Sequence, residues 1–273
     1  MFNDIMLGQY LPGNSFLHRR DPRFKIIASI LYIVSVFLCL KLWSFGLLIA
    51  VTALTVGVSG VPVKSLFKSL KPLLFILIFT TVYHLLSHKG EIPLVQFWVI
   101  SIYLEGVIYA VVMSLRIICL LIGSTVILTY TTSPIQLTDG LERLLSPLKV
   151  LHVPVHEFSM MMTIALRFIP TLMEETVKIM NAQKARGADF SSGGLIRRAK
   201  ALIPILIPLF ISAFRRAGEL ATAMECRCYR GGKGRTRMTQ LSITPGDVAL
   251  LLVLVAFGAG IVVINRFAPG FSI

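Results

Sequence analysis

The sequence predicts an all-α, polytopic membrane protein with about five transmembrane helices plus long amphipathic helices on the cytoplasmic side. The first observation is composition: the 273 residues are 55% hydrophobic and only 15% charged, whereas soluble domains are about 45–50% apolar and about 25% charged. The second is a set of five apolar runs, and the third is a charged helical stretch between the last two. Such an excess of apolar side chains requires lipid as a solvent.

Five runs are long enough to cross a hydrocarbon core of about 30 Å at about 1.5 Å per helical residue. They cover residues 26–40, 43–59, 72–87, 106–129 and 248–264. The first run is short, and Lys41 and Trp43 can anchor its end at the membrane interface. Because residues 1–25 are polar and no small-residue cleavage site follows them, we expect the first run to be retained as a span.

The basic residues predict the orientation of the spans. With the N-terminus inside, four Lys and Arg residues precede the first span, three lie between the second and third, and sixteen lie between the fourth and fifth. That places 23 of the 27 basic residues on the cytoplasmic side, as in membrane proteins generally. We therefore predict a cytoplasmic N-terminus and an external C-terminus.

The chain divides into three regions. Residues 1–133 hold the first four spans, and residues 238–273 hold the last. Residues 134–237 are too apolar for an ordinary loop and too charged to span, so we expect them to form cytoplasmic helices. Ser133 and Pro134 have the chemistry of a helix N-cap and first turn, which predicts a short helix over residues 135–145.

Two long helices follow, over residues 155–186 and 195–227. The first is amphipathic, because its polar positions recur every three or four residues; they are Arg167, Thr171, Glu174, Lys178 and Asn181. The second contains only 14 residues of unbroken apolarity, ALIPILIPLFISAF. A run of that length is typical of a buried or interfacial segment rather than a span.

Both long helices end on an arginine between small residues, in Ala185-Arg186-Gly187 and Cys226-Arg227-Cys228. The helix dipole favours one such arginine by about 0.3–1 kcal/mol. Two helices with the same ending suggest more than capping. Small neighbours leave room for a guanidinium to enter a groove and bind a carboxylate or backbone carbonyls in bidentate fashion. The two ends therefore predict two contacts with a cytoplasmic partner.

The sequence lacks the motifs of common enzyme and cofactor sites. GGKGRT at residues 231–236 does not have the spacing of a P-loop, HEF at 156–158 lacks the second histidine of a zinc protease, and no GxSxG is present. Cys226 and Cys228 form a lone CxC, short of the four ligands of a zinc site. The net charge of +14 is explained by cytoplasmic loops, so we expect no metal, no cofactor and no nucleic-acid partner.

Arg116 is the charge that lies well inside a predicted span. Charged side chains within a membrane are costly, and they usually face protein or water. Three explanations remain open for Arg116: a structural contact with another helix, a contact with a partner membrane subunit, or a shorter true span.

These features together resemble the transmembrane T component of energy-coupling factor (ECF) transporters, the EcfT family. GQYLPGNSFLHRRDPRFKI resembles the family's opening segment, LRFIPTLMEET with AQKARGADF resembles its coupling helix with an Ala-Arg-Gly motif, and MECRCYRGG resembles the second such motif. The likeness covers essentially the whole chain. One departure is that the second motif reads Cys-Arg-Cys.

The resemblance implies a multi-pass protein of a prokaryotic cell membrane that couples ATP hydrolysis to vitamin or micronutrient uptake. Two cytoplasmic ABC ATPases, which bind ATP and Mg²⁺, would dock on Arg186 and Arg227. A separate S component in the lipid bilayer would capture the substrate. The chain itself would not be an enzyme. Two alternatives are an intramembrane enzyme, with Arg116, His84 and His156 as its active groups, and an ordinary ABC permease subunit.

Overall fold

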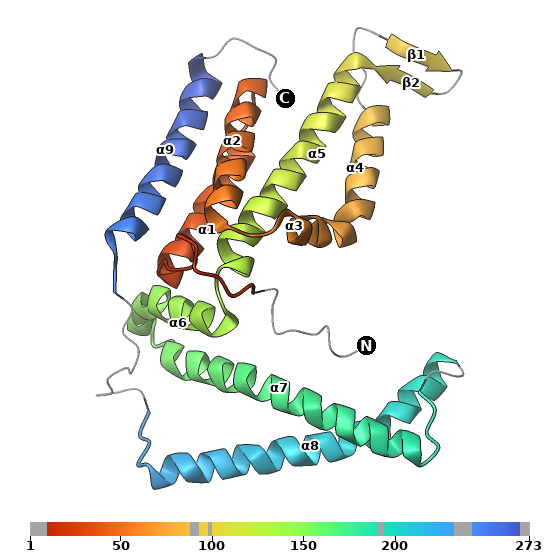
Figure 1. Cartoon of the computed structure of the whole chain (residues 1–273), viewed down its shortest axis with the longest axis vertical. Helices are drawn as coiled ribbons and strands as arrows, with labels where there is room; N and C mark the ends of the chain where they lie inside the picture. Colours follow the sequence, from red (N-terminus) through yellow and green to blue (C-terminus); the bar gives the residue numbers. More distant parts are fainter. Residues whose placement is uncertain (1–9, 88–92, 98–99, 191–193, 232–241, 268–273) are drawn as a thin grey trace. The chain divides into compact units, whose positions relative to one another are not determined.

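The computed structural model describes residues 10–87, 93–97, 100–190, 194–231 and 242–267, and structural statements refer to these (Figure 1). Their contacts divide into two compact units. The membrane unit comprises Gln9–Gly140 and Leu241–Ile273, and the coupling unit comprises Leu141–Gln240. Helices dominate both units, which confirms the all-α prediction.

In the described part of the chain, the membrane unit contains six complete α-helices. Its helices are α1 (Pro22–Leu38), α2 (Leu42–Ser59), α3 (Val63–Leu70), α4 (Leu74–Ser87), α5 (Leu104–Ser124) and α9 (Pro245–Phe267). A 3-10 turn, η1 (Lys71–Leu73), joins α3 to α4, and a π-helical turn, η2 (Thr125–Tyr130), extends α5. Neither turn was predicted.

A chain segment of three helical pieces leads from the membrane unit to α8. It consists of α6 (Pro134–Leu144), the 3-10 turn η3 (Ser146–Leu151) and α7 (Val155–Ala185), and then α8 (Leu195–Cys226) follows. Ser133 caps α6 as predicted: its hydroxyl accepts the Gln136 N–H at 3.3 Å, and the Gln136 side chain accepts the Ser133 N–H at 3.2 Å. This reciprocal capping box fixes where α6 begins.

Five helical segments in the described part of the chain are long and apolar enough to cross a membrane. Four of them, 42–59, 63–87, 104–130 and 245–267, contain predicted spans. The fifth is α8, over residues 196–226, which we expected to be interfacial. An apolar stretch over residues 201–214, between Lys200 and Arg215, gives this segment a high mean hydropathy. The cytoplasmic placement of α8 stays a prediction.

The first predicted span is the exception, because α1 has 17 residues and is not among those five. It begins at Pro22, four residues earlier than predicted. The Asp21 carboxylate caps it by accepting the Arg23 N–H at 2.9 Å. Lys25 lies inside the helix with its side chain buried, and its Nζ donates to the carbonyls of Thr131 and His18 at 2.8 and 3.2 Å. A buried ammonium satisfied by carbonyls is not visible in a hydropathy pattern.

A β-hairpin before α5 was not predicted either. Strands β1 (Pro93–Phe97) and β2 (Ile100–Tyr103) pair antiparallel, with Phe97 opposite Ile100 and Pro93 opposite Tyr103. The strands are only five and four residues long, too short for a clear alternation of apolar and polar residues.

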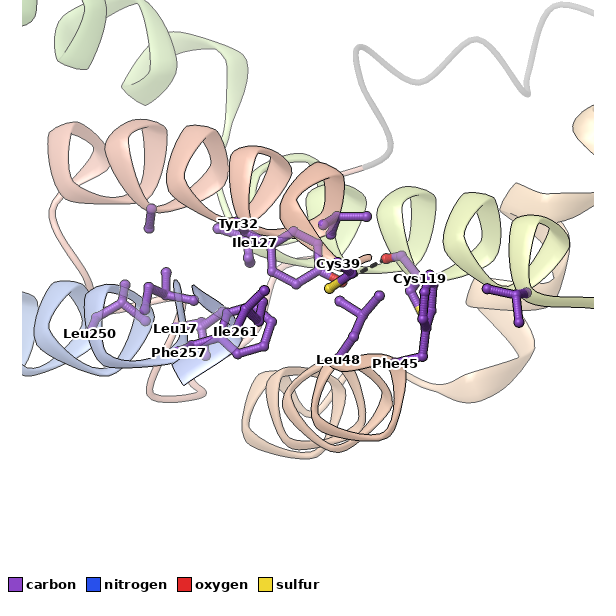
Figure 2. Packing of buried hydrophobic residues seen from close by; sticks show 14 residues of the cluster. Leu17, Tyr32, Cys39, Phe45, Leu48, Cys119, Ile127, Leu250, Phe257 and Ile261 are labelled. Atoms are coloured by element: carbon purple, nitrogen blue, oxygen red, sulfur yellow. Dashed lines mark hydrogen bonds between the residues drawn. The ribbon is translucent and has the colours of Figure 1, made fainter. Parts of the chain in front are cut away.

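The core of the membrane unit lies among α1, α2, α5 and α9, around Tyr32 (Figure 2). Tyr32 is fully buried, and its hydroxyl donates to the Cys119 carbonyl at 2.8 Å and lies 2.8 Å from the Thr52 hydroxyl. Its ring stacks on Phe257 with the centroids 6.4 Å apart. One aromatic side chain therefore connects four helices.

The start of α9 is fixed by a buried carboxylate. Asp247 is fully buried and accepts hydrogen bonds from the Thr244 N–H and hydroxyl, both at 2.7 Å, and from the Asp21 N–H at 3.1 Å. The Arg20 guanidinium lies 3.9 Å away. These bonds join the start of α9 to the start of α1, and they satisfy a charge that burial would otherwise penalise.

Gly123 of α5 should be required for this packing. A Cβ at that position would overlap the Tyr32 ring, whereas a Cβ on Gly57 of α2 would meet nothing within 4 Å. We predict that Gly123→Ala destabilises the protein by about 1–3 kcal/mol through overpacking. Gly57→Ala, the matched control, should be neutral or stabilising because alanine favours helix. Thermal unfolding of the detergent-purified variants measures both effects, and equal unfolding temperatures would contradict this packing.

Candidate partner-docking site

The C-terminal end of α7 is closed by a left-handed residue after Arg186. Arg186 is the C-cap, and its N–H donates to the carbonyls of Ala182 and Gln183. Gly187 follows with φ +86°, its N–H donating to the Lys184 carbonyl at 2.9 Å, and the Ala188 N–H donates to the Gln183 carbonyl at 3.0 Å. This pair of bonds is a Schellman motif, which satisfies the last carbonyls of the helix.

The end of α8 repeats the same motif 41 residues later. Arg227 is the C-cap, and Cys228 takes the place of the glycine with φ 55°. The Cys228 N–H donates to the Glu225 carbonyl at 2.8 Å, and the Tyr229 N–H donates to the Met224 carbonyl at 3.0 Å. Both arginines therefore leave their helices at the same position of the same turn.

The two motifs are open to solvent in the coupling unit. All six predicted residues, Ala185, Arg186, Gly187, Cys226, Arg227 and Cys228, are exposed. Figure 1 shows the ends of α7 and α8 far apart, at opposite ends of the helix pair. The structure does not bring the two arginines together, and each is free to meet a separate partner surface. That they bind a partner stays a prediction.

The GGKGRT stretch at residues 231–236 lies, apart from Gly231, outside the described residues. Arg230 is described and exposed.

An ion pair between α7 and α8 was missed by sequence reasoning. An Arg216 Nη2 donates to the Glu175 Oε2 at 3.1 Å, and both side chains are partly buried. The Ser212 hydroxyl and the Arg216 guanidinium hold the pKa of the Glu175 carboxyl below its ordinary value of 4.5. The pairing of residues 41 positions apart depends on how the helices cross, which no local pattern specifies.

A wide apolar groove lies near the middle of α7 and α8. It has a volume of about 570 Å³ and is lined by Leu172 of α7 and by residues 206, 207, 209–211 and 213 of α8. Its neighbourhood includes exposed aromatic side chains: Phe210 and Phe214 are 65% and 63% exposed, with ring centroids 4.6 Å apart. We call this exposed surface, which is formed mainly by residues 206–214 of α8, the apolar flank of the helix pair.

Arg116 lies in α5 and contacts other helices of the membrane unit. Its Nη2 donates to the Cys39 carbonyl at 2.5 Å, at the C-cap of α1, and its guanidinium carbon is 5.2 Å from the centroid of the Phe45 ring in α2. A cation over an aromatic face is favourable when little water is present. The structure thus places Arg116 in contact with the end of α1 and with α2, and its role stays a prediction.

The alternative of an intramembrane enzyme would use Arg116, His84 and His156 as active groups. His156 Nδ1 lies 3.0 Å from the Glu142 carboxylate and links the end of α6 to the start of α7. His84 belongs to α4 in the membrane unit, and His156 belongs to the coupling unit. Among the described residues, no group of three or more His, Cys, Asp or Glu side chains could hold a metal ion.

Comparisons with known proteins identify what the chain is similar to. The family model described as cobalt transport protein, CbiQ, matches residues 13–238. The chain is 54% identical to an energy-coupling factor transporter transmembrane protein of Ruminiclostridium cellulolyticum over 94% of this chain and 96% of that protein. Proteins of the same name are 54% identical in Acidaminococcus fermentans and 46% identical in Bacillus subtilis, over 94% and 95% of this chain and 95% and 97% of the relatives.

The residue at the left-handed position should make the two helix ends differ in their stability against opening. A side chain in this conformation costs roughly 1–2 kcal/mol relative to glycine. We predict that Cys228→Gly slows amide exchange at Tyr229, and that Gly187→Ala accelerates it at Ala188, each by about fivefold or more, as expected for about 1 kcal/mol. Hydrogen exchange read by mass spectrometry measures both.

Gly218→Ala is the control for these substitutions, because Gly218 lies in the body of α8 and a Cβ there meets nothing within 4 Å. It should leave exchange at both helix ends unchanged. Unchanged exchange at Ala188 in Gly187→Ala would show that the left-handed turn does not limit the opening of that end.

The ion pair between α7 and α8 predicts a charge-swap rescue. Glu175→Arg and Arg216→Glu should each lower the Tm of the purified chain by about 2 °C, and the double variant should recover most of the loss. Glu174→Arg, at an exposed neighbouring position, is the control and should change the Tm little.

Because the pKa of Glu175 is lowered, the stabilisation by this ion pair is fully present above pH 4.5 and disappears as the pH falls through the lowered pKa. Additive losses in the double variant would contradict a direct pair.

Proposed function

This chain belongs to the family of energy-coupling factor transporter transmembrane proteins, and from that premise we propose that it is the coupling subunit of an ECF-type importer. In this proposal, the chain transmits the ATP-driven movement of two cytoplasmic ABC ATPases to a substrate-binding S component during vitamin or micronutrient uptake. The family is that of a transporter's membrane component rather than of an enzyme.

The observation that carries the proposal is the repetition of one helix end. Arg186 and Arg227 are each the C-cap of a long helix, each is exposed, and each is followed by a left-handed residue that turns the chain aside. An arginine presented in this way can place its planar fork of donors against carboxylates or carbonyls on a partner. Each ATPase would receive one arginine.

The helices that carry the arginines have the form needed to transmit movement. At about 1.5 Å per residue, α7 and α8 are each roughly 45–50 Å long. The bond between Glu175 and Arg216 ties one helix to the other. When ATP binding brings the ATPases together, the two docked ends would be displaced with them, and the helix pair would carry that displacement to its apolar flank.

The apolar flank is the surface we assign to the S component. Phe210, Phe214 and their neighbours on α8 are exposed, and an uncovered apolar surface of this kind marks a contact with protein or lipid. A small hydrophobic membrane protein resting on this flank would be released or reoriented as the helices move. ATP and Mg²⁺ would be bound by the ATPases, and this chain would hold no cofactor.

The proposed placement is the cell membrane of a prokaryote, with the N-terminus in the cytoplasm and the C-terminus outside. The excess of Lys and Arg in the predicted cytoplasmic segments supports this orientation. It also puts both arginine ends on the side where the ATPases and ATP are found.

Charge reversal tests whether the arginines dock the ATPases. We predict that Arg186→Glu and Arg227→Glu each lower the amount of ATPase that co-purifies with the tagged chain by about tenfold, equivalent to about 1.4 kcal/mol. The double variant should lose transport while still inserting into the membrane. Arg→Ala should have a smaller effect, because it adds no repulsion. Arg197→Glu is the matched control, because Arg197 is an exposed arginine outside the two motifs. ATPase retention equal to wild type in the double variant would refute the proposal.

A further inference from the structure

The end of α8 opens into a groove. The groove has a volume of about 420 Å³ and lies between the first half of α7 and the last turns of α8. Met160 and Ile164 of α7 and Leu220 and Met224 of α8 supply its apolar wall, and Arg227 with residues 228–231 completes it. Pockets of about 300–1,000 Å³ can hold ligand-sized groups, so the groove has room for a large side chain.

The groove arises from the same Schellman motif that presents Arg227. In this motif the residue after the left-handed position packs over the helical residue to which its N–H is bonded. At the end of α8 these two residues are Tyr229 and Met224, and both line the groove. At the end of α7 the corresponding residues are Ala188 and Gln183, one small and one polar. The two helix ends thus share one backbone geometry, but this pair of positions holds two large side chains at the α8 end and a small and a polar one at the α7 end.

The charge around the groove selects the partner's chemistry. Arg227 and Arg230 both line it and are exposed, so an occupant that carries a carboxylate beside an apolar side chain complements it. A second copy of this chain would bring the same two cations against them and be repelled. Glu219 and Glu225 are exposed on the last two turns of α8 and disfavour an anionic lipid surface.

We infer that this groove receives an apolar side chain, flanked by a carboxylate, from the ATPase that docks on Arg227, and that it makes the α8 end selective for one of the two ATPase positions. The inference rests on the proposed function. Met160 and Met224 suit such a groove, because a thioether side chain repacks readily around an inserted group. The α7 end would recognise its ATPase by polar contacts alone.

Filling the groove tests this inference. The variant Met160→Trp with Ile164→Trp is co-expressed with both ATPases, and the complex is purified in nucleotide-free buffer so that the ATPases do not hold each other. We expect retention of one ATPase to fall by about tenfold while the other is unchanged. Ala165→Trp, next to Ile164 but not lining the groove, is the control and should retain both. Loss of both ATPases or of neither would overturn the inference.

A second measurement does not depend on the fold tolerating two tryptophans. A photo-crosslinking benzophenone amino acid in place of Ile164 should form an adduct with the same ATPase in intact membranes, and one in place of Ala165 should not. An adduct only with lipid or with a second copy of this chain would overturn the inference.

Arg227→Glu separates this inference from the proposed function. If Arg227→Glu removes an ATPase and the filled groove does not, the groove inference is wrong and the proposed function stands. If neither change removes an ATPase, the proposed function fails as well.

Discussion

The two exposed arginines depend on one physical constraint: the last carbonyls of two long helices must find hydrogen-bond donors. In α7 and α8 that need is met by a backbone reversal through a left-handed residue, Gly187 in one and Cys228 in the other. The reversal turns the following chain away from the helix axis and leaves the C-cap arginine exposed. A helix that simply frayed would present the same arginine without a defined direction, and a docking contact would have to order it first.

The two units of the chain meet different physical demands. In the membrane unit, buried polar groups such as Lys25 and Asp247 are satisfied by carbonyls and N–H groups of neighbouring segments, and Tyr32 closes the core. The coupling unit leaves apolar side chains of α8 uncovered and relies on few contacts between its helices. This uncovered surface is the one that we propose for the S component, because a fully packed surface could not receive a partner.

Periodicity and end signals in the sequence were enough to predict the long helices and the cap at Ser133. The early start of α1 was missed because the buried Lys25 ammonium is stabilised by hydrogen bonds to backbone carbonyls, and only the fold brings the Thr131 carbonyl near it. The crossing contact of Glu175 with Arg216, the hairpin before α5 and the groove beside Arg227 depend on positions far apart in the chain. Both arginine motifs could be found in the sequence, because a Schellman motif involves only neighbouring residues. The residues that surround each motif in space come from distant parts of the chain.

The most direct measurement places photo-crosslinkers at Ala185 and Cys226, which flank the two arginines, in membranes that contain the whole complex. We predict an adduct with an ATPase from each position, and loss of each adduct when the neighbouring arginine is replaced by glutamate. Adducts with an ATPase from only one position, or from neither, would contradict the proposal that each helix end docks one of two ATPases.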